Sequence, residues 1–192
     1  MNADERWLTI VGIGEEGWDG LNTEARLAIE SAELLYEGAR HLDLVPVTAS
    51  TASRVAWPSP MASTVQRILT DHRREKKVTV LASGDPMLYG GGVLLTRDLA
   101  AGEFRVVPQV SAFSLACARL GWPMAETDLV SLVNRPIEHL YRFLYPSQRL
   151  IVFSEDGGTP LIVARLLTHA GYGPSKVSVF GKLGRAGREN DD

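Results

Sequence analysis

The sequence is poor in cysteine, with Cys117 as its single thiol in 192 residues. One thiol excludes an internal disulfide and a cysteine zinc cluster, so we expect Cys117 to be a small apolar residue on a helix face. No apolar run approaches the ~20 residues of a membrane helix, and the first residues lack the charge and apolar core of a signal peptide. We therefore expect a cytoplasmic protein with no membrane partner.

The chain also has no excess of basic residues. Lysine and arginine number 20 against 23 aspartate and glutamate residues, for a net charge of −3. General nucleic-acid binders carry a basic surface that neutralises phosphates. We therefore predict no nucleic-acid partner, and any anionic ligand must meet a local basic patch.

Motifs of hydrolases and nucleotide-binding proteins are missing or weak. There is no Gly-x-Ser-x-Gly, no histidine near His41 at metal-ligand spacing and no Walker lysine, so we predict no metal and name no catalytic residue. His41 is expected to be a helix-surface or capping residue. Gly12 to Gly17 formally satisfies a dinucleotide pattern, but Glu15 and Glu16 would meet the pyrophosphate. A NAD-dependent enzyme is a distant alternative, and we expect these glycines to let a loop cross the end of a sheet.

Strands and helices alternate along the chain, and 45% hydrophobic content is enough for a core. Buried strands are expected at 7–11, 34–36, 78–81, 104–107, 129–133, 150–153 and 177–180, and 47–59 is expected to be a loop with at most one short strand. Helices are expected from caps at Asn22 or Thr23, Ser59-Pro60, Ser111 and Thr159-Pro160, with further helices around 93–99 and 137–144. This pattern predicts an α/β fold of two small domains, 1–108 and 109–192, with mainly parallel sheets and a cleft between them.

The stretch from Leu81 to Gly92 is the strongest candidate for a ligand-binding loop. Gly84, Asp85 and Pro86 form a turn directly after a predicted strand, where open α/β sheets bind ligands. The glycines after Tyr89 cost helix stability unless a close backbone approach requires them. An ordinary strand-to-helix connection is the alternative. The cations at 73–77 are interpreted as structural, because they follow the end of a helix.

Five stretches together resemble the tetrapyrrole methylase family, S-adenosylmethionine-dependent enzymes of corrin and sirohaem synthesis. The first, Ser83-Gly84-Asp85-Pro86-Met87-Leu88-Tyr89-Gly90, is similar to the family's signature loop. The others are Val11-Gly12-Ile13-Gly14-Glu15-Glu16-Gly17, Ala39-Arg40-His41-Leu42, Ala116-Cys117-Ala118-Arg119-Leu120-Gly121-Trp122-Pro123 and Phe153-Ser154-Glu155-Asp156-Gly157-Gly158-Thr159-Pro160. They resemble the precorrin-6Y C5,15-methyltransferase branch and its single-activity cobalt-precorrin-7 C5 relatives.

The resemblance implies a C-methyltransferase that acts on C5 of a precorrin, in cobalamin biosynthesis, by direct methyl transfer. It implies S-adenosyl-L-methionine in the cleft as the cofactor. The residues implied to hold the cofactor are Gly84, Asp85, Pro86, Leu88 and Tyr89 from the first domain, and Ser111, Ala112, Phe153 and Ser154 from the second.

The implied substrate carries many carboxylates, so the cleft should offer cations. Arg40 and Arg135 are the candidate substrate-binding residues, with a solvated surface charge as the alternative for each. The resemblance also implies a homodimer, and it raises a C15-methylating decarboxylase domain or subunit as a partner. Whether the precorrin contains cobalt is open.

The sequence departs from the family pattern in three places. Gln109 and Ala112 stand where members usually carry serines, and Val133 and Asn134 stand where they carry the histidine and glycine of His-Gly-Arg-Pro, so a possible acid-base histidine is absent. The second domain is expected to lack a final strand. A methyltransferase of the same fold with an RNA or protein substrate, and a non-catalytic cofactor-binding relative, are the alternative functions.

Overall fold

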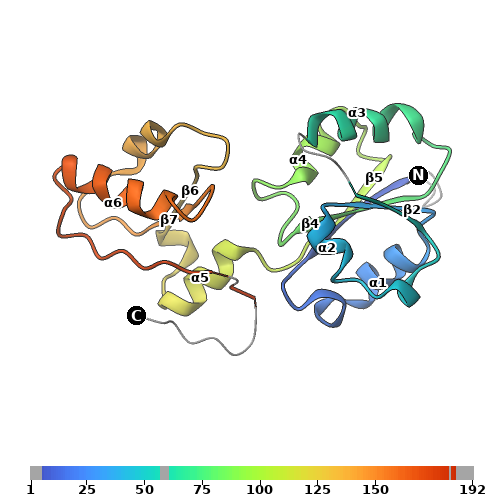
Figure 1. Cartoon of the computed structure of the whole chain (residues 1–192), viewed down its shortest axis with the longest axis horizontal. Helices are drawn as coiled ribbons and strands as arrows, with labels where there is room; N and C mark the ends of the chain where they lie inside the picture. The colour runs from blue at the N-terminus through green and yellow to red at the C-terminus, as the bar shows by residue number, and fades with distance from the viewer. Residues whose placement is uncertain (1–5, 57–60, 182, 185–192) are drawn as a thin grey trace. The chain divides into compact units, whose positions relative to one another are not determined.

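The computed structural model describes residues 6–56, 61–181 and 183–184. It contains two compact units, the first ending at Ser111 and the second beginning at Ala112. Both are α/β units with parallel sheets, which confirms the predicted fold class (Figure 1). No helix in the described part of the chain is long and apolar enough to cross a membrane.

The first unit is built on a five-stranded parallel sheet with the strand order β3-β2-β4-β1-β5. The strands are β1 (Leu8–Ile13), β2 (Leu34–Glu37), β3 (Ser53–Ala56), β4 (Val78–Ser83) and β5 (Phe104–Val107). The helices are α1 (Thr23–Glu30), α2 (Ala39–Leu42), α3 (Met61–Asp71) and α4 (Gly91–Thr96), with 3₁₀ turns at Gly17–Gly20 and Val47–Ala49. The predicted short strand within 47–59 is therefore β3.

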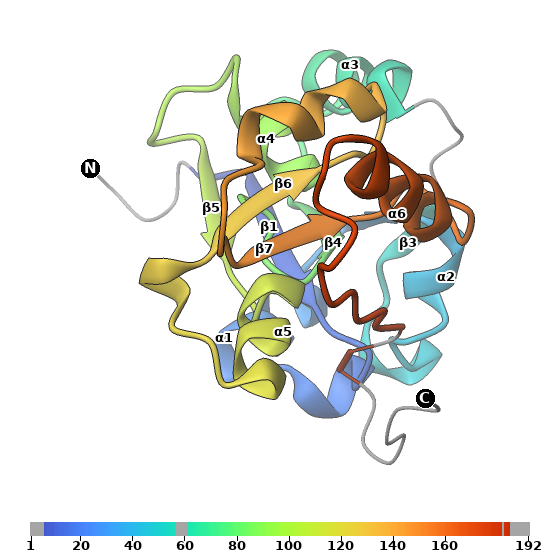
Figure 2. The ribbon, with the colours of Figure 1, turned by 90° about the vertical axis from the view of Figure 1, so that its left-hand side faces the viewer.

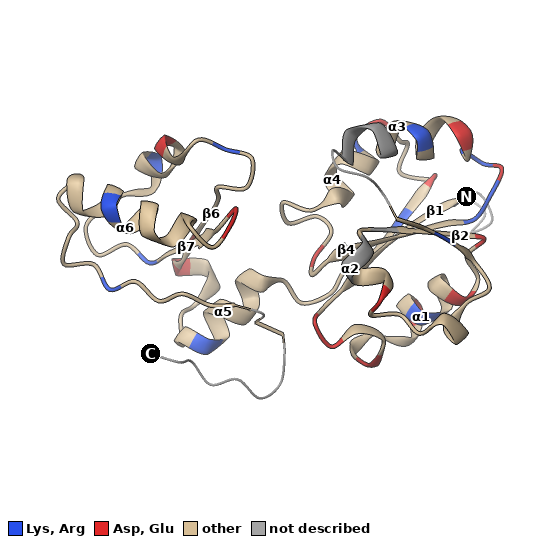
Figure 3. Ribbon diagram, viewed as in Figure 1, with Lys and Arg blue, Asp and Glu red and all other residues tan. Residues whose placement is uncertain are grey.

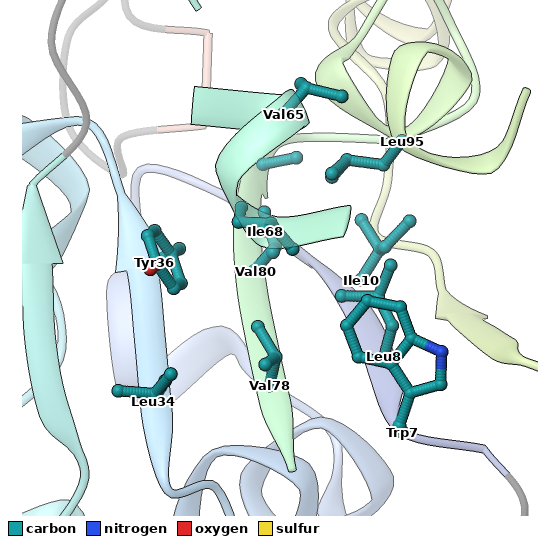
Figure 4. Close-up of a cluster of buried hydrophobic side chains, with 11 residues drawn as sticks. Trp7, Leu8, Ile10, Leu34, Tyr36, Val65, Ile68, Val78, Val80 and Leu95 are labelled. Carbon is teal, nitrogen blue, oxygen red and sulfur yellow. The ribbon is translucent and has the colours of Figure 1, made fainter. Parts of the chain in front are cut away.

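Alternation along β1 assigns its apolar side chains to the two faces of this sheet. Leu8 and Ile10 join the core under α3 and α4, whereas Val11 and Ile13 join the core over α1. Figure 4 shows Ile68 of α3 lying over Val80 of β4 in the first of these cores. Helices thus cover both faces, as a parallel sheet requires.

The second unit has a two-stranded parallel sheet, β6 (Asp128–Ser131) and β7 (Leu150–Phe153), whose strands lie side by side in Figure 2. Helix α5 (Ala112–Leu120) packs on one face through Ala116 and Cys117, and the buried Cys117 thiol confirms its predicted role. Helix α6 (Thr159–His169) and the 3₁₀ helix Ile137–Phe143 pack on the other face. A 3₁₀ turn at Met124–Glu126 precedes β6.

Two local predictions were wrong in the second unit. Val177–Phe180 forms no strand, and Val177 and Val179 are 47% and 65% exposed, because apolar alternation without a neighbouring strand provides no hydrogen-bond partner. The helix predicted around 137–144 is present as the 3₁₀ helix Ile137–Phe143. The side chain of Asp156, not Thr159, caps α6, since its Oδ1 accepts from Gly158 N and Thr159 N, each at 2.9 Å.

In the first unit, the helix cap predicted for α1 is present in the structure. Asn22 Oδ1 accepts a hydrogen bond from Ala25 N at 2.8 Å, which confirms the predicted start of α1. The predicted Ser59-Pro60 cap of α3 lies outside the described residues. The cations after α3 are structural, as expected, because Arg73 and Arg74 form ion pairs with the buried Glu103 at 2.6 and 3.3 Å.

Candidate functional site

The carboxyl ends of β1 and β4 form the topological switch point of the first sheet. β1 and β4 are neighbours, but the chain leaves β1 toward β2 on one side and leaves β4 toward β5 on the other. The two connections also pass on opposite faces, because α1 belongs to one core and α4 to the other. Ligands of open α/β sheets bind at such a point.

Glycine at position 12 allows the loops of three strands to meet there. A Cβ at Gly12 would overlap the carbonyl oxygen of Gly84 and would lie 2.6 Å from Gln109 N. Gly84 N donates to Ile13 O at 2.9 Å, which joins the loop after β4 to the end of β1. The prediction that these glycines let a loop cross the end of the sheet is confirmed.

The loop Gly84 to Tyr89 is shaped by its own backbone and by Asp85. Asp85 Oδ1 accepts from Met87 N at 2.9 Å, and Asp85 O accepts from Leu88 N at 3.1 Å. Gly84 has φ +58° and Tyr89 has φ +56°, both in the left-handed region. Met87 and Tyr89 are 46% and 47% exposed, so the loop presents large side chains to the solvent.

Close packing of α4 onto Pro86 explains the glycines that follow Tyr89. A Cβ at Gly90 or at Gly92 would lie 2.7 Å from Pro86 O. Pro86 itself is buried. The predicted close approach is therefore confirmed, because the backbone of Gly90 and Gly92 packs directly against Pro86 of the same loop. This contact fixes the loop against the start of α4.

Acidic side chains dominate the loops after β1 and β4. A Cβ at Gly14 would lie 2.6 Å from Glu16 Oε2, so the Glu16 carboxylate lies against the Gly14 backbone. Glu15 and Glu16 follow the carboxyl end of β1, and Asp85 follows that of β4. The lysines and arginines after α3 precede β4, and Figure 3 shows this blue segment at the opposite edge of the sheet. The charge at the carboxyl edge favours a cationic ligand over a pyrophosphate.

Gln109 fixes the loop after β5. Its Nε2 donates to Gly20 O at 2.8 Å, and its Oε1 accepts from Val110 N at 3.0 Å. The side chain therefore holds the loop after β5 to the 3₁₀ turn after β1. At the position where the resemblance predicted a serine in place of Gln109, this chain has an amide that makes two backbone contacts.

His41 makes a contact that the sequence did not predict. Its Nε2 and the hydroxyl of Ser83, the last residue of β4, share a hydrogen bond of 2.7 Å. Burial lowers the pKa of His41 below its ordinary value, which favours the neutral imidazole. His41 lies on α2 with a partly exposed side chain, as expected of a helix-surface residue, and the contact with Ser83 adds to that role. Its occurrence in the family-like stretch Ala39 to Leu42 was the available signal.

The other predicted site residues are distributed along the chain. Ser111 is 7% exposed and closes the first unit, and Ala112 opens α5 with an exposed side chain. In the second unit, Phe153 ends β7 and the exposed Ser154 follows it. Arg135 is exposed and its NH1 donates to Ser131 O at 3.2 Å. The side chain of Arg40 lies outside the described residues.

Metal ligands are not clustered in the described part of the chain, where no group of three histidine, cysteine, aspartate or glutamate side chains could hold an ion. The candidate site consists of the close backbone contacts at Gly12, the loop from Gly84 to Tyr89, and the carboxylates after β1 and β4.

The family model of the tetrapyrrole (corrin/porphyrin) methylases matches residues 7–190. The chain belongs to this family. The tetrapyrrole methylase match spans all of β1 to α6, including the loops at the switch point.

Two curated relatives of this methylase chain differ in length. It is 41% identical over 181 residues to a decarboxylating precorrin-6Y C(5,15)-methyltransferase of Sinorhizobium, covering 94% of this chain but 43% of that protein. It is 31% identical over 166 residues to the cobalt-precorrin-7 C(5)-methyltransferase of Salmonella typhimurium, covering 86% of this chain and 80% of that protein. The chain therefore spans less than half of the first relative and most of the second.

A solved structure of the same methylase family has a similar fold. The precorrin-6Y methylase of Archaeoglobus fulgidus is 29% identical, with a TM-score of 0.61, and the similarity covers 80% of this chain and 76% of that one. The agreement in fold supports the assignment to the family.

Proposed function

We propose that this chain is an S-adenosylmethionine-dependent C-methyltransferase that acts on C5 of a precorrin in cobalamin biosynthesis. The observation that carries the proposal is the identity to the C(5)-methyltransferase of Salmonella typhimurium, which spans 80% of that enzyme. The decarboxylating Sinorhizobium enzyme has the same C5 position in its name, but this chain spans only 43% of it. C5 is the position that both names share, so methylation of C5 is the activity that we assign to this chain.

The carboxyl edge of the first sheet fits S-adenosylmethionine. This cofactor carries a sulfonium and an ammonium against one carboxylate, and its net positive charge matches an edge that bears Glu15, Glu16 and Asp85. The buried Gly12 lets Gly84 O and Gln109 N approach its backbone, and this contact holds the loops after β4 and β5 together at the switch point. The loop from Gly84 to Tyr89 would hold the cofactor on the first unit.

The chemistry supplied by the bound cofactor is an electrophilic methyl group. The corrin precursor contributes the nucleophilic carbon, so no covalent intermediate with the protein is needed. The residues of the chain act by orientation, because holding methyl and carbon in line lowers the entropic part of the barrier. Ser111, Ala112, Phe153 and Ser154 are proposed as further cofactor-binding residues, and Arg40 and Arg135 as partners of substrate carboxylates.

Calorimetry with S-adenosylhomocysteine tests the cofactor assignment, with NAD as the comparison ligand. We expect saturable binding of one S-adenosylhomocysteine per chain and no heat of binding with NAD. No binding of S-adenosylhomocysteine would overturn the methyltransferase proposal. Binding of NAD in its place would support the dinucleotide alternative, which Glu15 and Glu16 disfavour.

We also propose that the chain forms a homodimer in the cytoplasm. The lone Cys117, buried and unpaired in α5, is compatible with a reducing compartment. Light scattering coupled to size exclusion would give twice the 21.0 kDa chain mass for the dimer. A C15-methylating decarboxylase is proposed as the partner activity, since the Sinorhizobium relative combines C5 and C15 in one name.

A further inference from the structure

The contact between His41 and Ser83 joins α2 to the first residue of the signature loop. Ser83 is the last residue of β4, and its exposed hydroxyl lies 2.7 Å from His41 Nε2. The next residue is Gly84, whose left-handed conformation begins the turn toward Asp85. A side chain that fixes Ser83 therefore acts directly on the start of this turn.

The short helix α2 is itself anchored from the side of the sheet. Arg54 of β3 donates from NH1 to Leu42 O and Val45 O, each at 2.9 Å, and from NH2 to Pro46 O at 2.6 Å. These bonds supply donors to carbonyls at and beyond the end of α2. The turn that follows α2 adds further donors, from Leu44 N to His41 O at 2.9 Å and from Val45 N to Leu42 O at 3.3 Å. Contacts with β3 and β4 complete its support. His41 thus projects from a fixed segment, although α2 has only four residues.

We propose that His41 is a positioning residue, which orders the Ser83 hydroxyl and thereby holds the Gly84–Tyr89 loop in the conformation that binds S-adenosylmethionine. The inference rests on the proposed function, because it concerns the same cofactor loop. It adds a residue from a different element, 42 positions away in the sequence, to the support of that loop.

The neutral imidazole suits this role. A neutral ring has one nitrogen that donates and one that accepts, so either tautomer allows a hydrogen bond between Nε2 and a hydroxyl. The lowered pKa of His41, caused by burial, favours that form. A neutral ring also adds no positive charge near a cationic cofactor, where a protonated one would oppose binding.

The test measures S-adenosylhomocysteine affinity by calorimetry and thermal unfolding by circular dichroism for His41→Ala, His41→Gln, Ser83→Ala and the double variant His41→Ala/Ser83→Ala. We expect each alanine variant to weaken binding by about tenfold, the scale of one lost hydrogen bond in a fixed site. The double variant should be no weaker than the weaker single variant, because both remove the same bond. Glutamine places a polar group near the position of Nε2, so His41→Gln should recover most of the affinity.

The matched control is His72→Ala. His72 Nε2 shares a 2.8 Å hydrogen bond with the hydroxyl of Tyr36, a second histidine–hydroxyl pair in the same unit, located just after the end of α3. Its loss should change thermal unfolding and leave S-adenosylhomocysteine affinity within about twofold of the wild type, because distant sites act independently.

Three outcomes would overturn the inference. The first is wild-type affinity in folded His41→Ala and Ser83→Ala, which would leave the proposed function intact. The second is an additive loss in the double variant, which would mean that the two residues act separately. The third is a wild-type protein that binds no S-adenosylhomocysteine, which would overturn the proposed function together with this inference.

Discussion

Gly12 is the residue on which the geometry of the switch point depends most. An added methyl group would overlap Gly84 O and crowd Gln109 N, so the loops after β4 and β5 would have to move apart. We predict that Gly12→Ala destabilises the protein by about 1–3 kcal/mol, as overpacking does. It should also weaken S-adenosylhomocysteine binding in calorimetry by at least about tenfold.

Gly181→Ala is the control for this substitution. No atom lies within 4 Å of a Cβ built at Gly181. This variant should keep both the stability and the affinity of the wild type. If Gly12→Ala behaved in the same way as Gly181→Ala, the packing of the three loops on Gly12 would not support the site.

Arg135 is the predicted contact for substrate carboxylates whose side chain lies within the described residues. It is exposed, and one of its nitrogens bonds to the carbonyl of Ser131. Arg135→Ala should weaken precorrin binding by about tenfold, the scale of a charge-assisted contact, and leave S-adenosylhomocysteine binding nearly unchanged. Fluorescence titration with the tetrapyrrole gives the first affinity and calorimetry the second. Equal tetrapyrrole affinity for both proteins would exclude a substrate role for Arg135.

Glu103 has a structural role at the opposite edge of the first sheet. Its side chain is 4% exposed and accepts hydrogen bonds from Arg73 Nε at 2.8 Å, Arg73 NH2 at 2.6 Å and Ala100 N at 3.2 Å. The hydrogen bond from Arg73 is the main cause that lowers the pKa of Glu103 from 4.5 to about 2. Glu103→Gln should destabilise the protein by roughly 1–3 kcal/mol at neutral pH, since it weakens a buried charged network.

The pH dependence of that effect follows from the direction of the shift. Because the pKa of Glu103 is lowered in the folded state, its carboxylate stabilises the fold at a pH above the ordinary pKa of 4.5. This contribution is lost as the pH falls toward about 2. Urea unfolding should therefore show the difference between wild type and Glu103→Gln shrinking over this window. Glu126→Gln is the control, because its pair with Arg149 is mostly exposed and contributes little. A difference that does not vary with pH would contradict the assignment.

Among the elements, α6 depends on a cap that begins outside the helix. Asp156 Oδ1 accepts from Gly158 N, Thr159 N and Thr159 Oγ1, each at 2.9 Å. These bonds, with the Thr159 hydroxyl first, lower the pKa of Asp156 below its usual 3.8. Asp156→Ala should lower the thermal midpoint by a few degrees near pH 7, because free N–H groups at the start of a helix lose their acceptor.

The cap should lose its effect in acid, because the pKa of Asp156 is lower in the folded state than in the unfolded chain. The carboxylate stabilises the fold at a pH above its ordinary pKa, and this contribution is lost as the pH falls through the lowered pKa of the folded state. Differential scanning calorimetry at neutral and acid pH measures this. Glu155→Ala removes the neighbouring exposed carboxylate and should leave the midpoint unchanged at both values. A larger loss for Glu155→Ala than for Asp156→Ala would place the cap elsewhere.

Local sequence patterns predicted helices and strands well where the hydrogen-bond or packing partner lies close by in the sequence. Asn22 caps α1 through Ala25, three positions away, and the short apolar run of β1 predicted a buried strand. Val177–Phe180 was also predicted as a strand but has no strand beside it in the described structure. The difference lies in the neighbouring backbone, which the composition of a segment does not contain.

At the scale of the whole molecule, the two-unit α/β fold and the turn of the candidate site at the end of β4 could be predicted from the sequence. The contacts that shape this turn and its surroundings could not, because their partners are distant. Ser83 meets His41 across 42 positions, and Gln109 meets Gly20 across 89. No spacing rule links such residues, since strand order brings them together only after the sheet has formed.

Methyl transfer is the most direct test of the proposed function. The protein is incubated with S-adenosylmethionine that carries an isotope-labelled methyl group and with a precorrin that lacks the C5 methyl, and the product is examined by NMR. We expect one labelled methyl group at C5. A precorrin left without a labelled methyl group, or labelled at another carbon, while the same protein binds S-adenosylhomocysteine, would contradict it.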